Sequence, residues 1–590
     1  MSKKDSRSFI SETYHLLFLP DRPFVRVESQ NGASFTELFV LSSIHSLHGR
    51  DDTTRIGEWQ VDEKPGVTTF LLRVESSLWK SKQYRFRCFP HRFTYDVTVE
   101  GNGQLVEANY FGGYYSGQPR WGSGFFWSGQ HFQSGFDLEP NTAENNYFSA
   151  ETNMTIDLMG VPLPGRDDWF FTPPPFCFAM QLQEGWLSLG VETTPGQNRF
   201  TQYAYHGKPS AFYLSCAYDG CTSVAGSYQL PAIGFDFAMD EYEALDRHVR
   251  AWSAIQPVSN ENSDSAQPKP DWWHTPIFCG WGAQCHLVSA QGGRAPDYAR
   301  QDVYEMFLET LDRENVQPGI IVLDDKWQST YGENRADEAK WPDLPGFIAR
   351  QHTYGRKVLL WLKAWDPEGL PVEECVTNAL GLPVACDPSS PAYESRLRQA
   401  VERMISSDGY DADGFKIDFT ARVPAGPGLK LQGDVWGLEL MHLYLEILST
   451  EAKRMKPDAL IMTHTPHPYL QDVVDMIRLN DINSGRDINP SMIHRARVAA
   501  IACPKLSIDT DDWPMPNKAA WRAYTRLQPE LGVPSLYYVT HIDATGEALD
   551  AEDYALIRES WDRYRERSLQ VRHGEQTKHL SIDPSISGEQ

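Results

Sequence analysis

The chain has 590 residues, of which 41% are hydrophobic, and this is enough apolar side chain for large cores. Because single cores stop growing beyond roughly 250 to 300 residues, we expect two or more domains. The 54 basic and 79 acidic side chains give a net charge of −25, which repels phosphate backbones and anionic headgroups. The composition therefore argues against nucleic acids and membranes as partners and favours a neutral or cationic ligand.

The nine cysteines form no CxxC pair, and their odd number argues against a disulfide framework or a zinc knuckle. We expect mostly buried thiols. The basic N-terminus is not followed by an apolar stretch of about seven or more residues, and no run approaches about 18 apolar residues. These patterns predict a cytoplasmic protein with no metal and no other cofactor, and they leave homo-oligomerisation open.

The first 250 residues have the pattern of antiparallel strands. Apolar and polar side chains alternate over residues 93–100 and 84–88, a period typical of half-buried strands. We predict an N-terminal β-sandwich over residues 1–252. Inside it, residues 110–127 are rich in glycine and aromatic side chains. This segment is either a loop that reaches toward a ligand or aromatic packing beneath the turns of the sandwich.

A polar, Pro- and Ser-rich linker is predicted over residues 253–272. After it, β-rich runs alternate with amphipathic helices, which is typical of a parallel α/β domain. No GxGxxG motif or P-loop follows the first run, so we prefer a (β/α)8 TIM barrel over residues 273–570 to a doubly wound sheet. Residues 571–590 are polar and aperiodic and predict a flexible tail. The eight expected strands are 276–281, 319–325, 357–362, 413–419, 459–464, 475–480, 505–509 and 534–540.

The fourth expected strand contains Lys416 and Asp418, which are two residues apart and so share one face. An acid at the carboxyl end of a barrel strand lies where such folds hold their catalytic groups. A neighbouring ammonium would keep Asp418 ionised, as a nucleophile must be. The other interpretation is a structural ion pair at the end of a strand.

Further carboxylates, tryptophans and cations follow the other strands, and they suit sugar chemistry. Glycosidic cleavage needs one carboxylate that attacks and a second that protonates the leaving oxygen, and Asp418 and Asp481 supply such a pair. Asp324 and Asp325 can accept hydrogen bonds from vicinal hydroxyls, although both could instead cap the following helix. The carboxyl ends of the strands form the mouth of the expected barrel. Trp281 and Trp361 are candidates there for packing against a sugar ring. The remaining candidates for substrate binding are Lys416, Arg478 and His464.

Five ordered motifs resemble the barrel of the α-galactosidase clan, glycoside hydrolase families 27 and 36, with the family 31 α-glucosidases as more distant relatives. The resemblance covers roughly residues 275–545. The motifs are IVLDDKW (321–327), WPD (341–343), GRKVLLW (355–361), CDPSSP (386–391) and DGFKIDF (413–419).

The resemblance implies a retaining, exo-acting α-glycosidase that is most like an α-galactosidase and acts on an oligosaccharide or other glycoside. By position, Asp418 would be the nucleophile that forms a covalent glycosyl-enzyme, and Lys416 would bind a hydroxyl. Asp324 and Asp325 would bind the distal hydroxyls of the terminal sugar.

The acid/base of these families follows an arginine on strand six, which points to Asp481 after Arg478. If that register is wrong, Asp487 and Asp509 are the alternatives. The two carboxylates of a retaining pair should lie about 5 to 7 Å apart.

The sequence also departs from the family pattern. The segment THTPHP (463–468) replaces the glycine-rich, Cys-containing segment of family 36, which leaves the sugar open. His464 and His467 lack a third ligand and helical spacing, so we expect no metal site there. We also expect no C-terminal β-domain of the kind usual in the group, because few residues follow a final helix near Trp561. The alternatives are an α-glucosidase or α-xylosidase type, a raffinose-synthase-like glycosyl-transferring relative, an inactive sugar-binding protein and a metal-dependent barrel hydrolase.

Overall fold

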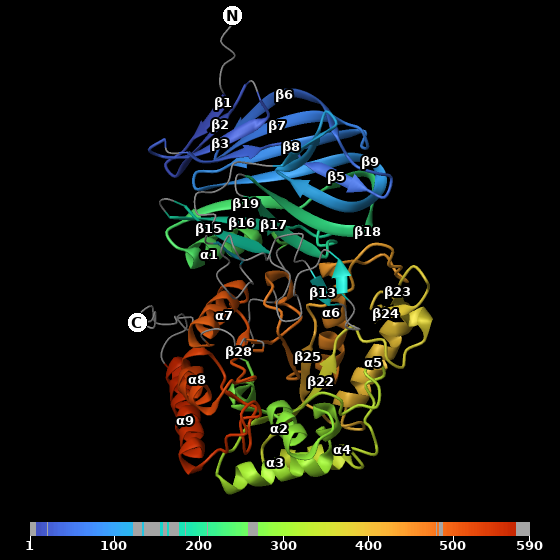
Figure 1. The fold of residues 1–590 in the computed structure, drawn as a ribbon, viewed down its shortest axis with the longest axis vertical. Helices are drawn as coiled ribbons and strands as arrows, with labels where there is room; N and C mark the ends of the chain where they lie inside the picture. The colour runs from blue at the N-terminus through green and yellow to red at the C-terminus, as the bar shows by residue number, and fades with distance from the viewer. Residues whose placement is uncertain are drawn as a thin grey trace, which may run out of the picture.

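The chain folds into an antiparallel β-sandwich stacked on a parallel α/β barrel (Figure 1), as the sequence predicts. The structure is a computed structural model. It describes residues 7–20, 22–32, 34–121, 132–134, 154–156, 162–164, 176–182, 185–208, 211–257, 269–479, 481–482 and 488–573. None of the helices in these ranges is both long and apolar enough to cross a bilayer.

Two sheets form the sandwich. The first has the order β1-β2-β3-β4, and the second follows the path β11-β10-β6-β7-β8-β9-β19-β16-β15-β12, with β5 and β18 also paired to β9 and β17 paired to β18. The first sheet contains β1 (Arg7–Ile10), β2 (Tyr14–Phe18), β3 (Phe24–Ser29) and β4 (Ser34–Phe39). The second contains β5 (Ser43–Ser46), β6 (Thr53–Lys64), β7 (Val67–Ser76), β8 (Ser81–Cys88), β9 (Arg92–Tyr110), β10 (Gly112–Tyr115), β11 (Gln118–Trp121), β12 (Phe132–Ser134), β15 (Cys177–Gln181), β16 (Trp186–Glu192), β17 (Gln202–Lys208), β18 (Ala211–Gln229) and β19 (Ala232–Ala238). A separate hairpin pairs β13 (Met154–Ile156) with β14 (Pro162–Pro164).

Aromatic rings fill the space between these sheets. The rings of Phe18 and Phe70 stack with their centroids 4.0 Å apart. The alternation predicted for residues 84–88 is confirmed, because β8 buries every second side chain. On β9 the polar Asp96 is buried as well, since Arg85 and Arg87 cover it with ion pairs. Partnered charges thus allow both faces of this strand to be covered.

The aromatic segment predicted over residues 110–127 is described as far as Trp121. There β10 and β11 form a hairpin at the end of the large sheet. Tyr110 and Phe111 are buried, and the Tyr110 hydroxyl donates to the Pro231 carbonyl at 3.0 Å. This part of the segment is therefore packed within the sandwich, and residues 122–127 lie outside the described residues.

The parallel sheet has the order β28-β27-β26-β25-β22-β21-β20-β29. Backbone hydrogen bonds close it into a barrel, because Val533, just before β29, donates to Ile508 on β28 at 2.7 Å and accepts from Thr510 at 3.1 Å. All eight expected strands are present, several of them shorter than predicted. They are β20 (Ile277–Cys279), β21 (Ile320–Leu323), β22 (Lys357–Lys363), β25 (Gly414–Asp418), β26 (Leu460–Thr463), β27 (Met476–Arg478), β28 (Ser507–Asp509) and β29 (Ser535–Leu536).

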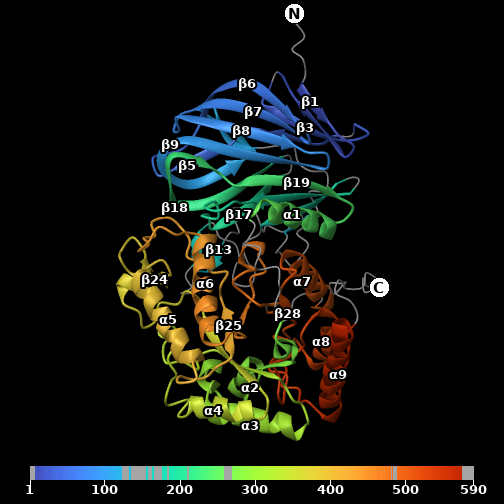
Figure 2. The same cartoon turned by 180° about the vertical axis from the view of Figure 1, so that it is seen from behind.

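Helices surround this barrel (Figure 2). Apolar strands such as β21, whose four residues are all buried, are typical of a parallel sheet covered on both sides. The helices are α2 (Trp281–Gln291), α3 (Gln301–Arg313), α4 (Leu344–Thr353), α5 (Pro391–Ile405), α6 (Leu438–Met455), α7 (Ile488–Ala502), α8 (Lys518–Leu531) and α9 (Ala551–His573). A short hairpin of β23 (Cys375–Thr377) and β24 (Pro383–Cys386) precedes α5.

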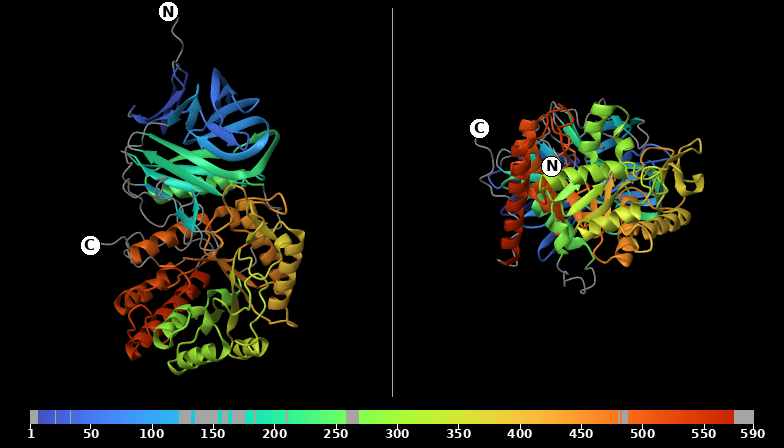
Figure 3. Two further views of the ribbon diagram at one scale, coloured as in Figure 1. Left: turned by 45° about the vertical axis from the view of Figure 1, so that its right-hand side comes forward. Right: turned by 90° about the horizontal axis from the view of Figure 1, so that it is seen from below.

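The sandwich lies against the barrel at the N-terminus of α6 (Figure 3). Arg199 forms an ion pair with Glu439 at 2.8 Å, and Leu438 donates its backbone N–H to Phe200. This helix follows strand four, so its N-terminus lies at the carboxyl face of the barrel, where the site is expected. The sandwich thus borders that face.

Helix α1 (Glu241–Ile255) joins the two parts. Asp240 caps it by accepting the backbone N–H of Glu243 at 2.8 Å, and Tyr242 contacts His494 of α7 at 2.8 Å. The helix continues into the first residues of the predicted linker, while residues 258–268 lie outside the described part of the chain. At the other end α9 reaches His573, beyond which nothing is described. The domain limits inferred from the sequence stay predictions.

Candidate active site

The two carboxylates expected to be catalytic meet at one guanidinium. Arg478 is the last residue of β27 and is 2% exposed. Its Nη2 donates to Asp418 Oδ1 at 2.9 Å, and its Nη1 donates to Asp481 Oδ1 at 2.8 Å. Strands four and six thus bring Asp418 and Asp481 to different nitrogens of one guanidinium.

Asp418, at the end of β25, is held as a carboxylate. Trp361 donates its indole N–H to Oδ2 at 3.2 Å, and His464 Nε2 lies 3.4 Å from Oδ1. Burial favours the neutral carboxyl, but Arg478, followed by His464 and Lys416, outweighs burial and holds the pKa of this group well below its usual range. Burial lowers the pKa of His464 to about 4, so its imidazole is neutral near pH 7.

Asp481 has the opposite electrostatic environment. It lies three residues beyond Arg478, and Arg495 of α7 fixes its backbone by donating to the carbonyl oxygen at 2.6 Å. Burial raises the pKa of Asp481 to about 6; Arg478 opposes this shift, while Asp418 and Asp511 add to it. The side chain is still 24% exposed, so a ligand can reach it. One carboxyl whose pKa is lowered beside another whose pKa is raised is the arrangement of an acid/base pair.

Lys416 pairs with Asp324 rather than with Asp418. Its Nζ lies 2.7 Å from Asp324 Oδ2, and the Cys279 thiol donates to the same oxygen at 2.9 Å. Lys416 still helps to lower the pKa of Asp418, as expected of a neighbouring ammonium, but Arg478 contributes more. Lys416 and Asp324 are two buried charges that compensate each other across neighbouring parts of the barrel.

Asp325 is a second carboxylate at the mouth, next to Asp324. The Tyr331 hydroxyl donates to its Oδ1 at 2.7 Å. Burial raises the pKa of Asp325 to about 6, although the bond from Tyr331 lowers it. The alternative that Asp324 and Asp325 cap the following helix is wrong, because Asp343 is the N-cap of α4. Neither of the two carboxylates therefore serves as the cap of α4.

The two tryptophans differ in what they offer. Trp361 is 1% exposed and acts as a hydrogen-bond donor to Asp418, so its face is not open for a sugar ring. Trp281, the first residue of α2, is partly buried and meets the ring of Trp513 edge-on, with centroids 5.9 Å apart. Gly282 behind it allows α2 to approach the strand-eight end, since a Cβ there would lie 2.7 Å from the Tyr537 carbonyl oxygen.

The alternative acids differ from Asp481 in their surroundings. Asp509 is buried and accepts the Ser535 hydroxyl and the Asp511 backbone N–H. Asp487 lies outside the described residues.

The residues around the site that were not predicted from the sequence include Cys279, Tyr331, Asp511 and Tyr537. Cys279, Asp511 and Tyr537 could have been found by applying the strand-end rule to strands one, seven and eight. Tyr331 lies in a loop without a periodic signal.

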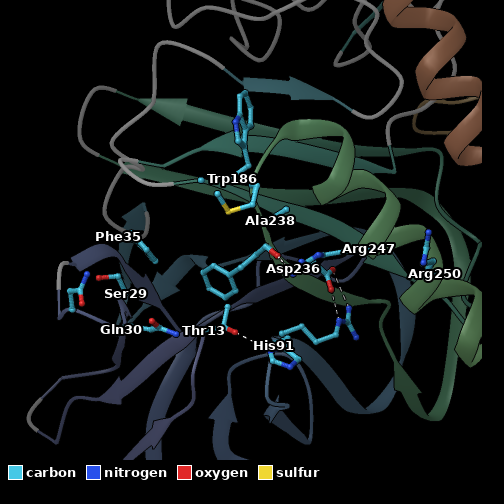
Figure 4. A pocket seen from close by; sticks show the side chains of 15 residues that line it. Thr13, Ser29, Gln30, Phe35, His91, Trp186, Asp236, Ala238, Arg247 and Arg250 are labelled. Carbon is cyan, nitrogen blue, oxygen red and sulfur yellow. Dashed lines mark hydrogen bonds and ion pairs between the residues drawn. The ribbon is translucent and has the colours of Figure 1, made fainter. Parts of the chain in front are cut away.

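The sandwich has a cavity of its own, of about 760 Å³ (Figure 4). Trp186, Phe35 and His91 are among its lining residues, and Asp236 is the single acidic residue among the described ones that line it. Near it, Glu192, Asp236 and His248 have the spacing of a metal site. Arg92, however, donates to both of these carboxylates, so their charge is already compensated without an ion. This cluster fits a structural ion-pair network.

No protein-family model and no curated protein matches this sequence. Among solved structures, a family 31 sulfoquinovosidase from E. rectale is similar with a TM-score of 0.54 and 11% identity, over 96% of this chain and 83% of that one. An α-galactosidase from Thermus thermophilus in complex with stachyose has a TM-score of 0.50 and 12% identity, over 85% and 99%. A Flavobacterium johnsoniae family 31 dextranase has a TM-score of 0.50 and 12% identity, over 96% and 69%.

These similarities span both the sandwich and the barrel. The chain therefore has the same fold as these glycoside hydrolases. At 11 to 12% identity the likeness concerns the fold, and it does not distinguish between family 31 and the α-galactosidase families.

Proposed function

We propose that this protein is a retaining, exo-acting α-glycosidase that hydrolyses terminal α-linked sugars by double displacement. One observation carries the proposal: Arg478 binds Asp418 and Asp481 through different nitrogens, and the pKa values of these carboxyls are shifted in opposite directions. Two carboxyl groups with separate acid and base roles are what glycoside hydrolysis requires.

In the first step Asp418 attacks the anomeric carbon, the glycosidic bond breaks, and the leaving oxygen takes the proton of Asp481. This gives a glycosyl ester of Asp418 and an ionised Asp481. Because the ester has no charge, one of the groups that raised the pKa of Asp481 is lost, and Asp481 becomes a better carboxylate. In the second step Asp481 removes a proton from water, which attacks the anomeric carbon and releases Asp418.

The polar groups around this pair are the proposed ligands of the terminal sugar. Asp324 and Asp325 accept hydrogen bonds from its hydroxyls, and Lys416 donates to one. We propose an α-galactoside as the first substrate to test. The motif order supports this choice, as does the Thermus α-galactosidase with bound stachyose, whose chain is covered over 99% of its length.

The test is a panel of aryl α-galactosides, α-glucosides, α-xylosides and α-N-acetylgalactosaminides, with the wild type and Asp418→Ala. We expect turnover of at least one substrate and a loss of about 10⁴-fold or more in Asp418→Ala. Azide should restore activity to this variant and give the inverted glycosyl azide. Asp472→Ala, at an exposed carboxylate on the surface of the barrel, is the control and should behave as the wild type.

Near-normal rates in Asp418→Ala would show that the nucleophile is misassigned. Product analysis with an added sugar acceptor separates hydrolysis from glycosyl transfer. A wild type that binds sugars but turns over no member of the panel would contradict the enzyme and favour a sugar-binding protein.

A further inference from the structure

Arg478 has a third carboxylate partner, Asp511, which lies two residues beyond β28. Asp511 Oδ2 accepts from Nη1 at 2.5 Å, and Nη1 is also the nitrogen that donates to Asp481. Asp511 is fully buried, so a sugar cannot reach it. Its contact with the reacting pair therefore runs through the guanidinium alone.

The backbone holds Asp511 in a fixed orientation. Its N–H donates to Asp509 Oδ1 at 3.0 Å, and its own Oδ1 accepts the N–H of Trp513 at 3.0 Å. Its φ is +52°, in the left-handed region that is uncommon for residues other than glycine. Unusual backbone of this kind persists where the surroundings over-determine it, often beside functional groups.

Charged and titratable groups face Arg478 and Asp481 from several elements, and Cys285 of α2 is one of them. Asp418 and Lys416 come from β25, His464 follows β26, and Arg495 comes from α7. Asp509 and Asp511 come from β28 and its end, and Tyr537 follows β29. Among the described residues, Asp511 is the buried carboxylate that shares a nitrogen with Asp481.

We propose that Asp511 is a positioning residue, which anchors Arg478 so that one guanidinium spans Asp418 and Asp481, and which competes with Asp481 for Nη1. This inference rests on the proposed glycosidase function. The competition leaves Asp481 with less than a full ion pair, and so helps it to keep its proton until the leaving oxygen takes it. Without that charge, Arg478 would turn toward Asp481 and hold it as a carboxylate.

The test compares Asp511→Asn with Asp512→Asn. Asp512 is the matched control, because it is adjacent and equally buried but accepts from Trp521 and from the backbone of Tyr537 instead of Arg478. For Asp511→Asn we expect the basic limb of the pH profile of kcat/KM to move about one pH unit lower. On alkyl glycosides, which need a proton, kcat should fall roughly 10- to 100-fold, against less than about threefold on dinitrophenyl glycosides. Asp512→Asn should leave both properties unchanged.

A wild-type profile in Asp511→Asn, or equal shifts in both variants, would overturn the proposal while leaving the glycosidase assignment intact. If Asp511→Asn does not fold, as judged by circular dichroism, Asp511→Ser takes its place with the same expectations, because it also removes the charge. A wild type without any turnover contradicts the proposed function and this inference together, so the two failures can be told apart.

Discussion

Buried charges occur in both the sandwich and the barrel, but their balance differs. In the sandwich, Lys82 and Asp51 are both 0% exposed and lie 2.6 Å apart. Lys82 also donates to the Ser42 carbonyl and the Thr53 hydroxyl, so each N–H of its ammonium group has an acceptor. At the barrel mouth a single arginine, Arg478, serves three carboxylates.

The pKa values follow this balance. Asp236 of the sandwich is buried, which would raise its pKa, but His248 and Arg92 lower it to about 2. Burial and the neighbouring carboxylates raise the pKa of Asp481 at the mouth to about 6, although the charge of Arg478 opposes this shift. Burial alone therefore does not identify a functional acid. At the mouth three carboxylates share one arginine, and the charges of Asp418 and Asp511 add to burial in raising the pKa of Asp481.

The largest effect that tests this comparison is expected from Asp481→Ala. Removing the proton donor should lower kcat on alkyl glycosides by roughly 10³- to 10⁴-fold, with a much smaller loss on dinitrophenyl glycosides, whose leaving groups need no proton. Azide should accelerate the variant and give a product of retained configuration, since the glycosyl ester still forms on Asp418. Rates and product configuration are measured together. If Asp509→Ala shows this pattern and Asp481→Ala does not, the acid is misassigned.

Breaking the balanced pair in the sandwich should affect stability instead of catalysis. Lys82→Met leaves Asp51 buried and uncompensated, and we expect a loss of about 3 to 5 kcal/mol in the free energy of unfolding. Chemical denaturation measures this loss, and kcat per folded molecule should stay at the wild-type value. Lys64→Met removes the exposed Lys64–Asp62 pair and is the control, with little expected change. A Lys82→Met protein as stable as the control would contradict the role of the pair.

The two acids should respond to neutralisation with opposite signs at pH 7. Asp236 has a folded pKa of about 2 against an ordinary 3.8, so its charge stabilises the fold above pH 3.8, and this contribution is lost as pH falls through 2. Asp481 has a folded pKa of about 6, so its ionisation costs stability as pH rises from 3.8 through 6. At pH 7 we expect the free energy of unfolding to fall by about 1 to 2 kcal/mol in Asp236→Asn and to rise by about 1 to 2 kcal/mol in Asp481→Asn.

Unfolding curves at pH 7 and pH 4 check these signs. The gain of Asp481→Asn should disappear at pH 4, where the folded wild type already holds the proton, whereas the loss of Asp236→Asn should persist. Equal signs for the two variants at pH 7 would contradict the contrast between the regions.

Much of the fold and part of the site could be predicted from the sequence. The eight runs were found because a parallel barrel buries both faces of each strand, which leaves short apolar segments followed by polar ones. The same rule led to Asp324, Asp418 and Arg478. The order of the strands in the large antiparallel sheet was not predictable, since alternation reports which side chains point inward and not which strand lies alongside.

The partners of the charged residues could not be predicted from the sequence either. Lys416 and Asp418 share a strand face, yet the lysine meets Asp324 beyond the next strand but one, because inward side chains of alternate barrel strands fill one layer. Burial of Trp361 could not be read from its position at a strand end. Tyr331 reaches Asp325 from a loop, where no periodicity says which way a side chain points.

That loop contact gives the smallest predicted effect. Tyr331→Phe removes the hydrogen bond to Asp325, whose pKa should then rise above its present value of about 6. A protonated Asp325 accepts hydrogen bonds from sugar hydroxyls less well, so kcat/KM should fall about tenfold, mainly through KM. The loss should be greater at pH 5.5 than at pH 7.5, because more of the variant is protonated at the lower pH. Tyr354→Phe, at a tyrosine that is 69% exposed, is the control. A fall in kcat with unchanged KM would instead assign Tyr331 to the chemical step, and the contrast between binding and catalytic carboxylates at the mouth would have to be redrawn.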